Sequence, residues 1–182
     1  MDALIYNVVL FVYIRLEIYM AQSSISPELQ QKLLHLKNRL INESAEKVIQ
    51  RSGKVQRQES FKQALVELSQ EFEDYLSETI ALRFNLHAGQ ARKVRFKKDR
   101  IRILKQHGID YLAIDGAQTA QVLAWIAQSI VYEDAVVTAD LNDTFPFWKE
   151  GYPMVQLDNV YEILSKDIQI HYEALVDELL RV

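Results

Sequence analysis

Eight of the 21 lysines and arginines lie within residues 92–105, RKVRFKKDRIRILK, where Asp99 is the only acidic residue. This basic segment contains Arg92, Lys93, Arg95, Lys97, Lys98, Arg100, Arg102 and Lys105. Clustered Lys and Arg side chains bind phosphates, because each contact releases counterions that are condensed on a polyanion. The segment is therefore predicted to bind nucleic acid or an acidic protein, or else to pair with acids of this chain.

An aromatic loop is a second candidate for binding. Residues 142–153 contain two prolines, a glycine and four aromatic residues, a composition typical of a structured surface loop. The aromatic residues are Phe145, Phe147, Trp148 and Tyr152. Exposed rings of this kind stack on bases or anchor a protein partner. The alternative is that the rings fold back onto the core as a lid.

Acidic residues at the ends of predicted strands suggest a metal-dependent reaction. Two-metal nucleases use carboxylates to hold ions about 3.5–4 Å apart, and Asp115 and Asp140 occupy strand ends here. Other acids in this region are Glu133, Asp134 and Asp143. Residues 112–116, LAIDG, resemble the first metal-binding strand of NurA-type and other RNase H-like nucleases, which implies a catalytic role for Asp115 with Mg²⁺ or Mn²⁺. Asp140 is the second candidate ligand because of its place at a predicted strand end. Alternatively, Asp115 and Gln118 form a helix capping box.

Several other chemistries are excluded by composition or spacing. The chain has no cysteine, which excludes disulfides, Cys-ligated zinc, iron–sulfur clusters and a thiol nucleophile. Its five glycines form no phosphate-binding loop, and its four histidines show no close metal-binding spacing. We therefore expect no cofactor unless the nuclease interpretation holds.

The elements before the basic segment are predicted to be two helices. Ser26, Pro27 and Glu28 form a helix start, and leucines at helical spacing follow as far as Leu40. Further apolar residues widen this stripe, and the helix is predicted to stop near residues 51–53. A second helix is predicted from Ser60 to a break at 87–89. The pair forms an antiparallel hairpin, or dimerises as a coiled coil through residues 29–84.

The basic segment itself alternates apolar and charged residues, which favours a β-hairpin. Its cationic face would present Arg95, Lys97, Arg100 and Arg102. The competing interpretation is a basic helix that runs from Arg92 to His107 and is capped by Gly108. Further strands are predicted at 109–114 and 135–139, with helices at 117–131 and from Asp158 onward.

These elements predict an α+β fold, in which an N-terminal helical hairpin and a long C-terminal helix flank a small, mainly antiparallel sheet; the alternative is an all-α fold. Residues 1–19 form an apolar N-terminal extension, and residues 20–182 form one globular domain. The apolar run at 3–14 is short for a membrane core of about 30 Å. We therefore expect no association with a membrane, and we expect a cytoplasmic location.

Taken together, the residues favour a non-catalytic protein that binds nucleic acid or another polyanion through residues 92–105. One alternative is a metal-dependent, RNase H-like nuclease that uses Asp115 and Asp140. The other is a helical dimerisation scaffold, a homodimer built through residues 29–84.

Overall fold

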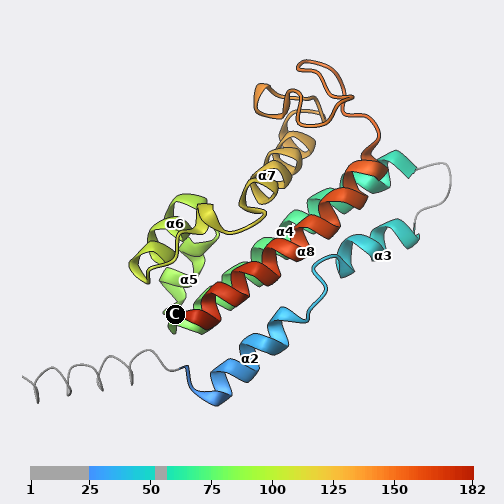
Figure 1. Ribbon diagram of the computed structural model, residues 1–182. Coiled ribbons are helices and arrows are strands. Elements are labelled where there is room, and N and C mark those ends of the chain that lie inside the picture. The colour runs from blue at the N-terminus through green and yellow to red at the C-terminus, as the bar shows by residue number, and fades with distance from the viewer. Residues whose placement is uncertain (1–24, 52–56) are drawn as a thin grey trace, which may run out of the picture.

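The computed structural model describes residues 25–51 and 57–182. Its helices are α2 (Pro27–Lys37), α3 (Glu43–Arg51), α4 (Arg57–Phe84), α5 (Ala88–Val94), α6 (Lys97–Gln106), α7 (Ala117–Tyr132) and α8 (Leu157–Arg181). Two 3₁₀ turns, η2 (Tyr111–Ala113) and η3 (Ala139–Leu141), flank α7. The long helices α4 and α8 lie side by side; α2 and α3 follow one side of this pair, and α5, α6 and α7 lie on the other (Figure 1).

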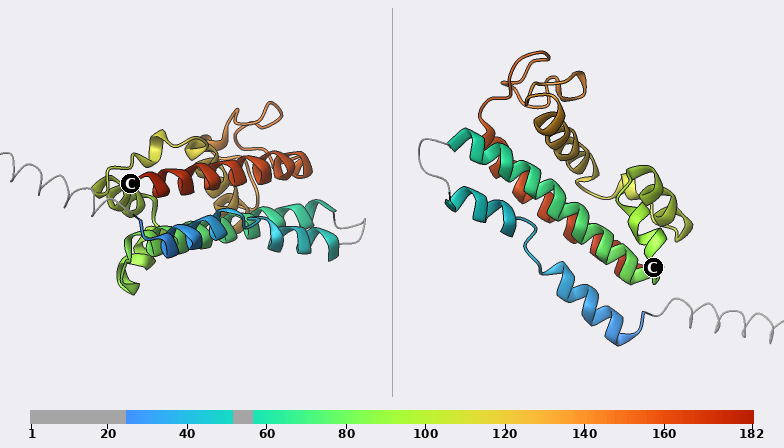
Figure 2. Two further views of the ribbon diagram at one scale, coloured as in Figure 1. Left: turned by 60° about the horizontal axis from the view of Figure 1, so that its bottom comes forward. Right: turned by 180° about the vertical axis from the view of Figure 1, so that it is seen from behind.

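The core fills the space between α4 and α8. Almost completely buried apolar side chains recur every three or four residues along both helices, as expected for stripes that face each other. On α4 they include Leu65, Leu68, Phe72, Leu76 and Ile80, and on α8 Leu164, Ile168, Tyr172, Leu175 and Leu179. Figure 2 shows the same layering from two other directions, with α7 packed against the pair. The predicted helices at 117–131 and from Asp158 are confirmed to within one residue.

The predicted α+β class is wrong, because the described residues form helices and no strand. The basic segment folds as α5 and α6, which lies closer to the competing helical interpretation. The buried residues of α6 are Arg100, Ile103 and Leu104, which follow helical spacing rather than alternation. Strand alternation would put Phe96 on the apolar face, whereas this residue is 67% exposed.

The other two predicted strands are also wrong. Residues 109–114 form a turn, because the Asp110 carboxylate accepts a hydrogen bond from the Leu112 N–H at 3.1 Å and starts η2. Residues 135–139 run beside 151–154 and share backbone hydrogen bonds with them, such as the one from the Val137 N–H to the Tyr152 carbonyl at 2.9 Å. Within the described chain, however, these segments form an isolated antiparallel bridge, between Val136 and Pro153, and no strand. Buried apolar residues in a loop produced the same sequence pattern as a short strand.

The first predicted helix is divided in two. The Ser26 cap is confirmed, since its hydroxyl accepts the Leu29 N–H at 3.2 Å. The helix stops after Lys37, and Gln169 of α8 then satisfies the non-helical backbone by accepting from the Ile41 N–H and donating to the Arg39 carbonyl, both at 3.1 Å. The second helix, α4, begins at Arg57 rather than Ser60.

Among the described helices, none has both the length and the apolar character required to cross a bilayer. The predicted extension at residues 1–19 lies outside the described residues.

Candidate nucleic-acid interface

The basic segment lies at one end of the molecule, where α5 and α6 form a short helical pair beside the C-terminal end of α8 (Figure 1). α5 begins at a histidine cap: the His87 Nδ1 accepts the N–H groups of Gly89 and Gln90 at 3.2 and 3.3 Å. The chain turns at Arg95 and Phe96, and α6 then runs to Gln106. The eight cations of the basic segment therefore lie on two adjacent helices and their connecting turn.

Seven of the eight basic side chains are exposed, and only Arg100 is buried. On α6, Lys98, Arg102 and Lys105 follow the spacing i, i+4, i+7, so they share one face of the helix. Arg92 and Lys93 are exposed on α5. We call the seven exposed residues the basic surface: Arg92, Lys93, Arg95, Lys97, Lys98, Arg102 and Lys105.

Most of the charge on the basic surface is not neutralised by neighbours. Arg95 pairs with Asp74 of α4, and Arg102 pairs with Asp99 at 2.6 Å. Lys97 donates to the neutral amide of Gln121 at 2.6 Å. The remaining four, Arg92, Lys93, Lys98 and Lys105, form no ion pair with any residue of 25–51 or 57–182. The alternative that the segment simply pairs with acids of this chain therefore applies to a minority of its cations.

A hollow of about 390 Å³ opens between α5 and α6. Lys93 and Arg102 contribute its two cations, and His87, Gln90 and Gln106 contribute polar groups. No carboxylate is among the described residues that line it. A site of this composition favours an anion such as a phosphate group.

Arg100 has a different role from the other seven. Its guanidinium donates to the Glu73 carboxylate of α4 at 2.6 Å and lies 4.9 Å from the centre of the Tyr111 ring. Its Nε atom is buried without a hydrogen-bond partner among the described residues. Arg100 was predicted to contact nucleic acid, but it instead links α6 to α4 through this ion pair. The opposite face of α6 is therefore exposed.

A buried polar chain continues from this arginine. The Tyr111 hydroxyl lies 3.1 Å from the Nε2 of His171, and the His171 Nδ1 donates to the Asp115 carbonyl. Burial lowers the pKa of His171 and raises that of Tyr111. His171 is then neutral with its proton on Nδ1, and its Nε2 accepts a hydrogen bond from the Tyr111 hydroxyl. This chain fixes η2 and the start of α7 against α8.

The acidic candidates are not brought together as a metal site. Asp115, Asp140, Glu133, Asp134 and Asp143 are all exposed. Within the described part of the chain, no three His, Asp or Glu side chains are grouped so that they could hold a metal ion. Residues 112–116 lack the strand on which the nuclease resemblance depends. The predicted capping box is also wrong, because Gly116 rather than Asp115 occupies the N-cap of α7.

The aromatic loop folds mostly inward. Trp148 is 1% exposed, and its indole N–H donates to the Val155 carbonyl at 3.0 Å. The Phe145 ring packs edge-on against it, with ring centres 4.7 Å apart and an angle of 70° between the ring planes. Phe147 is partly buried, and only Tyr152 is exposed, at 69%. The alternative that these rings pack as a lid therefore describes three of the four.

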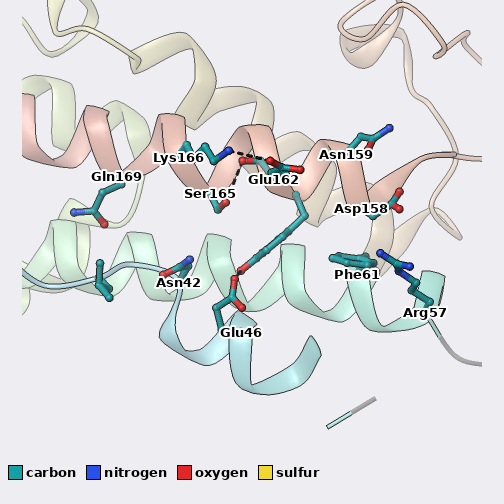
Figure 3. Close-up of a pocket in the computed structure, with 12 residues that line it drawn as sticks. Asn42, Glu46, Arg57, Phe61, Asp158, Asn159, Glu162, Ser165, Lys166 and Gln169 are labelled. Atoms are coloured by element: carbon teal, nitrogen blue, oxygen red, sulfur yellow. Dashed lines mark hydrogen bonds and ion pairs between the residues drawn. The ribbon is translucent and has the colours of Figure 1, made fainter. Parts of the chain in front are cut away.

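Another cavity, of about 490 Å³, lies where the α2–α3 connection meets α4 and α8 (Figure 3). Carboxylates of Glu46, Asp158 and Glu162 line it together with two cations, Arg57 and Lys166. Glu162 and Lys166 pair at 2.9 Å, as the dashed line in Figure 3 marks. This mixed, slightly acidic lining does not favour a polyanion, in contrast to the hollow between α5 and α6.

Sequence reasoning missed Glu73, Tyr111 and His171 as the residues that orient the basic surface. Each lies far from residues 92–105 in sequence or shows no local pattern, so only the tertiary fold brings them together. No protein-family model, curated protein or solved structure compared with this chain matches it.

Proposed function

We propose that this protein binds nucleic acid through the basic surface of α5 and α6, without catalysing a reaction on it. The observation that carries the proposal is the exposure of seven cations on one helical pair, five of them without an ion pair in the described chain. Each phosphate contact made by such a side chain releases condensed counterions, which is the main source of sequence-independent affinity.

Nucleic acid fits this surface better than an acidic protein does. A nucleic-acid backbone offers a continuous row of phosphates, and Lys98, Arg102 and Lys105 form a row of cations along α6. The adjacent hollow offers Lys93 and Arg102 together to a single phosphate. An acidic protein would present carboxylates at irregular spacing and would not require such a row.

A variant with four substitutions tests the proposal. Replacing Arg92, Lys93, Lys98 and Lys105 with Gln removes only unpaired, exposed charges, so the fold should keep its thermal midpoint. Fluorescence anisotropy with a labelled oligonucleotide would measure affinity across a salt series. We expect the slope of log K against log salt to flatten by about three to four units, at about 0.7–0.9 per lost phosphate contact.

A matched control separates location from total charge. Replacing Lys32, Lys47, Lys149 and Lys166 with Gln changes the net charge equally but removes lysines that each pair with a nearby acid outside the basic surface. The control should bind like the parent. Equal loss of affinity in both variants, or none in either, would overturn the proposal.

A further inference from the structure

Phe96 is unfavourable for the stability of the fold in two respects. Its ring is 67% exposed, although burial of a phenylalanine is strongly favourable. It also occupies the N-cap of α6, where Ser, Thr, Asp or Asn would accept a backbone N–H and phenylalanine forms no such bond. Local choices that work against the fold occur preferentially at functional sites.

The ring borders a pocket of about 250 Å³ between the start of α6 and α7. Ala117, Ala120 and Ala124 contribute small side chains from α7, and the Gln121 amide lies among them. Arg95 and Lys97, the neighbours of Phe96 in sequence, also line the pocket; Arg95 pairs with Asp74 as well, and Lys97 donates to the oxygen of the Gln121 amide. It therefore combines an exposed aromatic face, a small-residue wall, an amide and two cations.

Two further charged residues of this pocket compensate each other. Arg100 and Glu73 both line it, but they pair with each other at 2.6 Å. The volume is below the range of about 300–1,000 Å³ that is typical of sites for drug-sized ligands. A single flat ring system with a phosphate attached suits this size and lining better than a larger molecule.

We infer that this pocket holds one unpaired nucleobase, stacked on Phe96, and that the protein therefore prefers single-stranded over duplex nucleic acid. The inference rests on the proposed function. Bases stack on aromatic side chains in single-strand sites, and amide groups bond to their exposed edges. In a duplex the bases are stacked on each other, so Phe96 has no base face to contact. Lys97, which forms no ion pair in the described chain, holds the phosphate of the bound nucleotide, and Arg95 joins it by exchanging Asp74 for the phosphate.

The variant Phe96→Ser separates stacking from stability. Serine caps a helix, so the thermal midpoint should rise. Affinity for a labelled single-stranded DNA oligonucleotide should fall about 5- to 150-fold, the loss expected for one stacked base. Affinity for the duplex of the same sequence and the salt slope should not change, because no cation is removed. Phe96→Trp should keep the preference for the single strand.

Tyr132→Ser is the matched control, since Tyr132 is 79% exposed on α7 and lines no part of this pocket. This variant should bind both oligonucleotides like the parent. If the parent binds neither oligonucleotide, the proposed function fails and the inference with it. If the parent binds both equally, or if Phe96→Ser leaves single-strand affinity intact, only the inference on Phe96 is overturned.

Discussion

Two adjacent acids on α4 hold two arginines of the basic segment in opposite environments. Glu73 pairs with the buried Arg100, whose side chain is 5% exposed. Asp74 pairs with Arg95, and both side chains are more than half exposed. Removal of one partner from a buried pair leaves an uncompensated charge, whereas an exposed pair is replaced by water at little cost.

The first prediction compares Glu73→Ala with Asp74→Ala. We expect Glu73→Ala to lower the free energy of unfolding by about 3–5 kcal/mol, because Arg100 stays buried without its carboxylate. Asp74→Ala should cost about 0–1 kcal/mol. It should also strengthen nucleic-acid binding, since Arg95 becomes available to phosphate. Urea denaturation and oligonucleotide binding measure both effects, and equal costs for the two variants would contradict these roles.

The sequence predicted which residues carry the charge but not which of them are accessible. Arg100 and Arg102 look alike in the run RKVRFKKDRIRILK. Their difference arises because Arg100 falls on the face of α6 that meets Glu73 and Tyr111. A partner 27 residues away leaves no local signal in the sequence. His171, which contacts Tyr111 from 60 residues away, leaves none either.

At the level of elements, long helices were predictable and short ones were not. Apolar stripes extend over several turns in α4, α7 and α8, so their period is distinct. The seven residues of α5 and the ten of α6 contain too few turns for a helical period to be told from strand alternation. The break between α2 and α3 was also missed, because Gln169 of α8 provides the bonds that stabilise it.

The start of α7 depends on one glycine, which gives the second prediction of this section. Gly116 has φ +76°, and a Cβ there would lie 2.7 Å from the Cβ of His171. Gly108 has φ +81° but open space around it. Gly108→Ala should cost about 1–2 kcal/mol for its left-handed conformation alone.

Gly116→Ala should cost more than Gly108→Ala by about 1–3 kcal/mol, because the methyl group overpacks the contact between α7 and α8. Thermal unfolding followed by circular dichroism measures the difference. Equal stability of the two variants would contradict the steric conflict between a methyl group at position 116 and His171.

Basic and acidic residues are segregated along the chain. The chain has a net charge of −4, although residues 92–105 are strongly basic. Residues 106–182 contain 13 acidic and three basic residues. At 0.15 M salt the screening length is about 8 Å, so a bound polyanion is influenced mainly by the basic surface. At 0.01 M it is about 30 Å, close to the length of about 37 Å for the 25 residues of α8.

The last prediction follows from this screening. At low salt, the acidic residues should repel the same polyanion that the basic surface attracts. The plot of log K against log salt should therefore be linear near physiological salt, and its slope should become shallower as the salt concentration falls toward 0.01 M. The screening lengths set this range of salt concentration. Anisotropy titrations with a labelled oligonucleotide test this. Replacing Glu133, Asp134, Asp140 and Glu150, all exposed, with their amides raises the net charge from −4 to zero. That variant should restore a straight line, and a straight line for the parent itself would contradict the argument.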